Sequence, residues 1–246
     1  MGQPNSKTSR QKVFTPISAV VFDAVGTVMY PNPSVSEAYR DAIFRHSGLE
    51  ISPDKVAATV REALRQRSAS GDLTTTEADE HNFWADLIRQ LCPNAAGFQA
   101  CFDELFEHFA EPSNWDCFPE VAEVMCGLRD LGIRTAIASN FDLRLNPVCD
   151  GLPALDTVSN RIISSVVGWR KPAPQFFAAV CEHMKLQPNE ILFVGDDIIN
   201  DVKGAGDAGM QAVWINRSTP PESPSSDLIT ISSLKDLLTL GLPGAN

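Results

Sequence analysis

An alternation of short apolar runs with longer amphipathic stretches constrains the fold of this chain more than any other sequence feature. Five apolar runs have the length of buried strands: residues 17–22, 134–139, 161–165, 190–195 and 211–216. Helical spacing of apolar residues lies between the later runs, over 120–131 and 174–185. Since strands alternate with helices, we predict an α/β fold, a doubly wound and mostly parallel sheet with helices on both faces.

The long segment after the first strand breaks this alternation because it contains only helical patterns. The predicted helices are 34–47, 53–68, 77–91 and 97–109. We therefore predict an all-helical cap domain at 33–111, inserted into a core domain made of 15–32 and 112–246. The polar residues 1–14 are predicted to form a disordered leader, and a Pro- and Ser-rich loop precedes a last short strand at 228–231.

Composition restricts the partners and the compartment. The formal net charge is −11, which argues against nucleic acid or an anionic membrane surface as a partner, although a site for a small anion can still be locally positive. No apolar run approaches the ~18 residues of a membrane span. Six cysteines without a C-x-x-C pair, and a polar N-terminus, predict reduced thiols in a cytoplasmic protein. Monomer and homodimer both remain open.

Polar side chains follow three of the predicted strands, and one lysine precedes a helix. They are Asp23, Ser139 and Asn140, Asp196 and Asp197 with Asp201 one turn later, and Lys171. Because the carboxyl ends of parallel strands meet at one edge of a sheet, we expect these groups to lie together there.

Several carboxylates cannot stay ionised side by side without a counter-charge. A divalent cation would supply it, and oxygen ligands from a few acids suit Mg²⁺ better than zinc. The histidines and cysteines are not spaced for zinc. The sequence therefore predicts a Mg²⁺ site at this edge.

Four segments together resemble the signature of the haloacid dehalogenase superfamily. They are "FDAVGTV" from Phe22, "IASN" from Ile137, "RKPAP" around Lys171, and "GDDIIND" with "GAGDAGM" from Gly195. The resemblance covers nearly the whole chain. "SNFDLRL" and "VGWRKPAP" also resemble the branch that contains the HAD-like domain-containing-3 proteins, and the helical block matches the position of a cap in that superfamily.

The resemblance implies a nucleophile and a metal site. Asp23 would attack phosphorus and carry a covalent aspartyl-phosphate, which splits one hard step into two easier ones. Asp196 would bind Mg²⁺ together with Asp23 and the backbone carbonyl of Val25. Asp197 or Asp201 would complete or orient this set of ligands.

The resemblance also implies the groups that bind a small phosphorylated substrate. Ser139 and the amide of Asn140 would hold phosphate oxygens. Lys171 would neutralise developing charge and restrain the nucleophile. Gly26 lets the backbone turn close to the ligand, and Thr27 beside it completes the predicted substrate-binding residues.

Val25 departs from the pattern of the phosphatases in this superfamily, which have an aspartate two residues after the nucleophile. A positioned acid contributes roughly 10²- to 10⁴-fold in rate. The chain then fits one of three descriptions. It is a phosphatase whose substrate has a good leaving group or finds its proton elsewhere, a 2-haloacid dehalogenase whose halide leaves without a proton, or a non-catalytic metal-binding protein.

The dehalogenase has a difficulty, and so does a further variant, a phosphonate hydrolase. The related dehalogenases carry "FDAYGT", close to "FDAVGT", but their carbon chemistry uses no metal, and the acids of "GDDIIND" argue against that chemistry here. A phosphonate hydrolase needs a cap lysine that forms an imine, and Lys55 is the only lysine in the predicted cap. A metal-dependent phosphatase is the hypothesis that the sequence favours.

Overall fold

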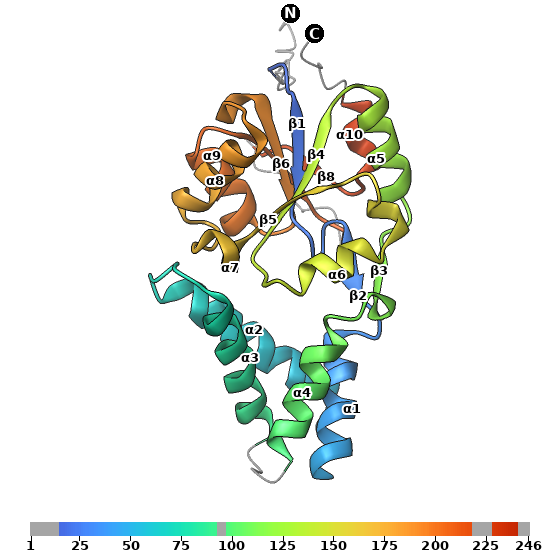
Figure 1. Ribbon diagram of the computed structural model, residues 1–246, viewed down its shortest axis with the longest axis vertical. Coiled ribbons are helices and arrows are strands. Elements are labelled where there is room, and N and C mark those ends of the chain that lie inside the picture. The colour runs from blue at the N-terminus through green and yellow to red at the C-terminus, as the bar shows by residue number, and fades with distance from the viewer. Residues whose placement is uncertain (1–14, 93–96, 218–227, 241–246) are drawn as a thin grey trace, which may run out of the picture.

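The computed structural model describes residues 15–92, 97–217 and 228–240. A six-stranded, fully parallel sheet forms its centre, with the strand order β5-β4-β1-β6-β7-β8 (Figure 1). The strands are β1 (Ala19–Phe22), β4 (Arg134–Ser139), β5 (Asn160–Ile163), β6 (Ile191–Gly195), β7 (Gln211–Ile215) and β8 (Thr230–Ile231). The predicted α/β fold is confirmed. The predicted leader, 1–14, lies outside the described residues.

The central strands are buried on both faces. Along β1, Val20 and Phe22 join one apolar cluster, whereas Ala19 and Val21 join the other. Helices cover both faces of the sheet (Figure 1). They are α5 (Val121–Asp130), α6 (Leu145–Asp150) and α10 (Lys235–Thr239) with the first cluster, and α8 (Pro174–Met184) and α9 (Gly204–Asp207) with the second. Strands without a solvent-facing side read as continuous apolar runs, which made them predictable.

A two-stranded antiparallel sheet marks the point where the chain leaves and re-enters the core. It pairs β2 (Met29–Pro31) with β3 (Trp115–Cys117). Between them, the described residues form four α-helices, which pack on one another beyond the carboxyl ends of the sheet strands (Figure 1). They are α1 (Val35–Ser47), α2 (Pro53–Ala69), α3 (Glu77–Leu91) and α4 (Phe98–His108), and we call them the helical insert.

Local signals fix the beginnings of the insert helices. Ser34, Ser52 and Thr76 each accept a hydrogen bond from a backbone N–H of the first turn, which satisfies a donor that has no partner within the helix. Ser34 also forms a capping box with Glu37. These caps place α1, α2 and α3 within one residue of the starts that the sequence predicts.

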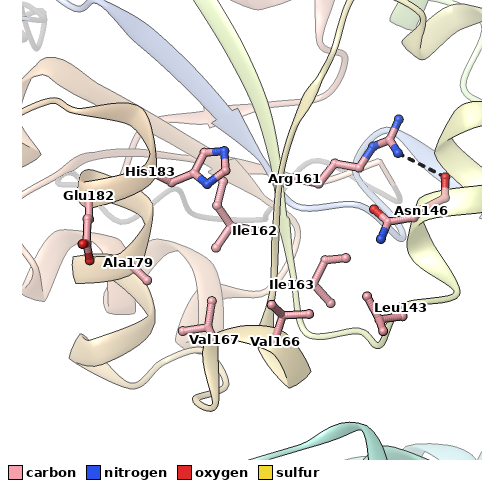
Figure 2. A pocket seen from close by; sticks show the side chains of 10 residues that line it. All are labelled: Leu143, Asn146, Arg161, Ile162, Ile163, Val166, Val167, Ala179, Glu182 and His183. Carbon is pink, nitrogen blue, oxygen red and sulfur yellow. Dashed lines mark hydrogen bonds between the residues drawn. The ribbon is translucent and has the colours of Figure 1, made fainter.

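A hollow of about 480 Å³ lies against the edge strand β5 (Figure 2). Ile162 and Ile163 of β5, Val166 and Val167 of α7 (Ser164–Val167), and His183 of α8 contribute to its wall. Among its lining residues Glu182 is the one acid, whereas three carboxylates gather at the carboxyl edge of the sheet.

Candidate active site

Three carboxylates meet at the carboxyl edge of the sheet. Asp23 follows β1, Asp196 follows β6, and Asp201 lies in a π-helix (Ile198–Lys203). One oxygen from each side chain lies within 4.8 Å of the others. Asp23 and Asp201 are buried, whereas Asp196 is open to solvent. The neighbouring parallel strands β1 and β6 thus unite residues far apart in the sequence, and we call Asp23, Asp196 and Asp201 the carboxylate trio.

Lys171 is the counter-charge of the trio. Its Nζ lies 2.6 Å from Asp23 Oδ1 and 2.7 Å from Asp201 Oδ1, and it donates a third hydrogen bond to the carbonyl of Ala138 at 3.0 Å. Burial alone would lower the pKa of Lys171, but the two carboxylates outweigh it and raise this pKa above its usual value. Lys171 is therefore an ammonium at neutral pH, and all three of its donors are satisfied.

One ammonium leaves the carboxylate trio with an excess of negative charge. Loss of hydration within the cleft, together with the charges of Asp23 and Asp201, raises the pKa of Asp196 to about 7. Burial raises the pKa of Asp201 to about 6, with Lys171 opposing and Asp23 adding to the shift. Oxygen ligands alone, held close together at a repulsive cost, fit a hard divalent cation such as Mg²⁺.

Two glycines make this close approach possible. A Cβ on Gly26 would lie 2.3 Å from Asp196 Oδ2. Gly26 also has φ +86°, a backbone conformation that residues with a side chain rarely adopt. A Cβ on Gly195 would lie 2.2 Å from Asp201 Oδ2. Neither position tolerates a side chain while the carboxylates keep their places. Gly26 therefore contributes to the site through space that it leaves for Asp196.

Ser139 and Asn140 orient the two central groups. Ser139 Oγ donates to Asp23 Oδ1 at 3.1 Å, the same oxygen that Lys171 contacts. The side chain of Asn140 makes two hydrogen bonds with the backbone of Lys171: its Oδ1 accepts from the N–H at 2.7 Å, and its Nδ2 donates to the carbonyl at 3.1 Å. The Asn140 side chain thus holds Lys171 in place.

Asp197 and Thr27, predicted to belong to the metal site and the substrate site, make other contacts in this structure. The carboxylate of Asp197 is not part of the trio; it accepts from the N–H groups of Ile199 and Asn200 at 2.8 and 2.9 Å and caps the π-helix. Thr27 is fully buried and is not among the residues that line the cleft. Its carbonyl accepts a hydrogen bond from Arg217, which anchors the loop after β1.

The carboxylate trio opens into a cleft of about 600 Å³ between the core and the helical insert. Val25 is partly buried and lines the cleft together with Asp23. The cleft therefore has an apolar side chain at the position for which the sequence pattern predicts a proton donor in a phosphatase. The insert contributes a set of residues that sequence reasoning did not identify: Arg61, Leu64, Arg65, Arg67 and Ser68 of α2, and Glu80 and Trp84 of α3. The i, i+3, i+4, i+7 spacing of 61, 64, 65 and 68 is the signal that marks this face.

Lys55 is exposed at the start of α2 and does not line the cleft. This removes the ground for the phosphonate hypothesis.

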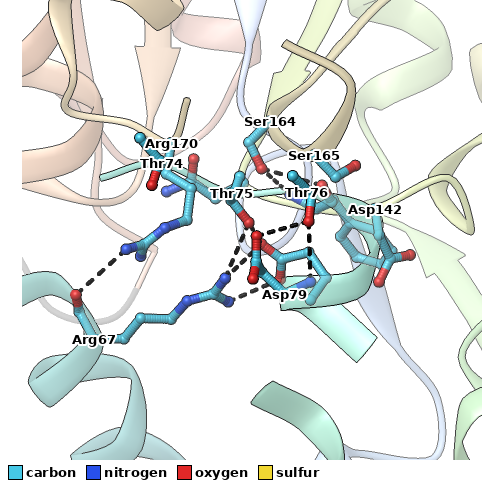
Figure 3. A network of polar contacts seen from close by, with 12 residues as sticks. Arg67, Thr74, Thr75, Thr76, Asp79, Asp142, Ser164, Ser165 and Arg170 are labelled. Atoms are coloured by element: carbon cyan, nitrogen blue, oxygen red, sulfur yellow. Dashed lines mark hydrogen bonds and ion pairs between the residues drawn. The ribbon is translucent and has the colours of Figure 1, made fainter. Parts of the chain in front are cut away.

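A polar network ties the insert to the segment just before Lys171 (Figure 3). Arg67 donates to both oxygens of Glu80 at 2.7 and 2.8 Å, and Thr75 donates to Glu80 at 2.7 Å. Across the boundary, Arg170 donates to the carbonyl of Asp72 at 2.7 Å through its side chain. Further contacts join the backbone of 73–75 to that of 168–170. The network fixes α2 and α3 over the carboxylate trio.

Comparison with known proteins identifies the family. The model of the haloacid dehalogenase-like hydrolases matches residues 17–209. The human haloacid dehalogenase-like hydrolase domain-containing protein 3 is 26% identical over 81% of this chain and 82% of its own length. A phosphoserine phosphatase from Thermus thermophilus is 28% identical over 77% of each chain. An (S)-2-haloacid dehalogenase from Burkholderia cepacia is 29% identical over 91% of this chain and 94% of its own.

Solved structures show the same fold. A HAD phosphatase from Thermococcus onnurineus superposes with a TM-score of 0.66 at 24% identity, over 93% of this chain and 100% of the other. A dehalogenase in an intermediate complex gives 0.72 at 22% identity, over 94% and 99%. The fold, the family match over most of the sequence and the phosphatases among its relatives establish that this chain belongs to the haloacid dehalogenase-like hydrolases and is a hydrolase.

Proposed function

We propose that this hydrolase is a Mg²⁺-dependent phosphatase that acts on a small phosphorylated metabolite through an aspartyl-phosphate at Asp23. One observation carries the proposal: Asp23 lies with Asp196, Asp201 and Lys171 in one cluster at the floor of an open cleft. A cluster of three carboxylates suits a divalent cation. A nucleophilic carboxylate next to such a cation, here Asp23 of the same cluster, suits phosphoryl transfer.

The residues of the chain divide the work. A carboxylate oxygen of Asp23 forms a bond to phosphorus while the bond from phosphorus to the ester oxygen breaks and the leaving oxygen takes a proton. Water then attacks phosphorus, releases inorganic phosphate and restores the Asp23 carboxylate. Lys171 and Ser139 both contact Oδ1 and fix the rotation of the nucleophile. Mg²⁺, when bound, would neutralise the trio and the phosphate.

Val25 limits the substrates of such an enzyme. Val25 lines the cleft with an apolar side chain, which cannot protonate the leaving oxygen. Acyl and aryl phosphates leave as weak bases and need this help least. The proposal therefore favours substrates with good leaving groups, or proton transfer from water.

Dehalogenation of a small haloacid is the second candidate, and Val25 is the observation that favours it. Asp23 would then attack carbon, and halide would leave as an anion without a proton. The carboxylate trio argues for the phosphatase, because carbon chemistry of this kind has no need of three clustered acids. Membership in a hydrolase family favours either activity over a non-catalytic role.

The test is a substrate screen with and without Mg²⁺, using Asp23→Asn as the inactive control. The proposal predicts phosphate release from acetyl phosphate and p-nitrophenyl phosphate that requires the metal and disappears in the variant. Chloride release from 2-chloropropionate without metal, and no phosphate release, would replace it by the dehalogenase.

The cellular setting is also part of the proposal. The six cysteines are free thiols, and among the described residues no helix has both the length and the apolar character for crossing a bilayer. Both observations are compatible with the proposed cytoplasmic location. A small anionic substrate as the partner, without nucleic acid or a membrane, is proposed on the charge of the chain, and the choice between monomer and homodimer stays a prediction.

A further inference from the structure

The cations that line the cleft differ in how they are partnered. Lys171 contacts Asp23 and Asp201. Arg67 forms a two-pronged ion pair with Glu80, and Arg65 forms one with Glu62. Each of these cations thus has a carboxylate partner within the protein.

Arg61 is the exception on the insert side. It lies on the exposed face of α2 that also carries Leu64 and Ser68, and this face lines the cleft. Among the residues that the structure describes, no carboxylate forms an ion pair with Arg61. An arginine without an internal partner, on the wall of a cleft that contains a reactive centre, is available to an incoming anion.

Arg170 increases the positive charge on the same wall. It is 6% exposed, and within the described part of the chain its side chain donates only to the carbonyls of Arg67 and Asp72, while its buried Nε has no hydrogen-bond partner. Burial and the neighbouring Arg67 lower the pKa of Arg170, as expected for a cation with no carboxylate in contact. The cleft thus combines an acidic floor at the trio with two arginines, Arg61 and Arg170, that form no ion pair among the described residues.

We propose that Arg61 binds a second anionic group of the substrate, so that the preferred phosphate esters also carry a carboxylate. The inference rests on the proposed phosphatase function and adds a substrate class to it. A carboxylate matches the planar, two-pronged donor geometry of a guanidinium. The phosphoryl group would lie at Asp23 and Lys171 while the carboxylate lies at Arg61.

Two phosphonates test the inference without turnover. Methylphosphonate and phosphonoacetate share the phosphonate group, and only phosphonoacetate has a carboxylate. Their dissociation constants are measured by calorimetry with Mg²⁺ present. We expect wild-type protein to bind phosphonoacetate more tightly, and Arg61→Gln to weaken this binding about tenfold or more, the loss expected for a charge-assisted hydrogen bond, with methylphosphonate nearly unaffected.

Arg89→Gln is the matched control, since it removes the same charge from an exposed position on α3 that does not line the cleft. It should leave both constants unchanged. Equal weakening of both phosphonates in Arg61→Gln would assign Arg61 to the phosphoryl group and overturn the inference, as would equal affinity of the wild type for both, or no binding of either. Selective binding without phosphate release from any ester would instead overturn the phosphatase proposal alone.

Discussion

At the scale of single residues, the substitution that matters most is the valine beside the nucleophile. The surroundings of Asp23 are complete: Lys171 and Ser139 hold its carboxylate, and Gly26 leaves room for Asp196. Val25 lines the cleft with an apolar side chain and has no proton to give. Under the proposed function, the site would form a bond to phosphorus more readily than it would assist a basic leaving group.

Replacement of Val25 by aspartate should restore the missing acid. We expect Val25→Asp to raise turnover of alkyl phosphates by about 10²-fold, the lower end of the range for a positioned acid, and of p-nitrophenyl phosphate by less. Steady-state phosphate release measures both. The control Val25→Asn introduces a side chain of nearly the same shape as aspartate but without an acidic proton, and it should not raise turnover. Unchanged activity of Val25→Asp on both classes of substrate would mean that the missing acid does not limit the rate.

At the scale of elements, apolar patterns predicted the sheet strands and the insert helices and missed several short elements. The six sheet strands and four insert helices follow from their apolar patterns and caps. The strands β2 and β3 have three residues each, too few for a pattern, and the π-helix after β6 depends on the Asp197 cap. The cleft-lining face of α2 was missed because its exposed arginines look like an ordinary solvated surface.

The buried ion pair between Arg67 of α2 and Glu80 of α3 should contribute more to the free energy of unfolding than the exposed ion pair within α2. Glu80→Gln removes one partner and leaves the Arg67 guanidinium without a carboxylate, which should cost about 3 kcal/mol of unfolding free energy. Glu62→Gln breaks the exposed pair with Arg65 and should cost much less, since water and salt screen that pair. Urea denaturation compares them. Equal costs would contradict a larger stabilising role for the buried pair between α2 and α3.

At the scale of the whole molecule, the order of strands in the sheet brings the candidate site together. Because β1 lies between β4 and β6, Asp23, Ser139 and Asp196 meet at one edge, which the sequence could predict from the rule for parallel sheets. Which face of the insert lies over that edge depends on contacts between residues 72–75 and 168–170. Such contacts between distant loops leave no periodic pattern in the sequence.

Binding of a divalent cation should stabilise the entire fold, since the trio joins two strands and the π-helix. At a Mg²⁺ concentration 100 times the dissociation constant, we expect about 2.7 kcal/mol of added stability. Thermal unfolding with and without EDTA measures it. Asp196→Asn should abolish the shift, and Asp207→Asn, an exposed acid outside the trio, should retain it. A full shift in Asp196→Asn would place the cation elsewhere.

The most direct test of the phosphatase proposal is to find the phosphoryl group on the protein. The protein is mixed with acetyl phosphate and Mg²⁺, quenched in acid during turnover, and digested for mass spectrometry. We predict that the peptide containing Asp23 gains the mass of one phosphoryl group, and that EDTA or Asp23→Asn prevents this gain. Phosphate release without that adduct, or with an adduct on another residue, would contradict the assignment of Asp23 as the nucleophile.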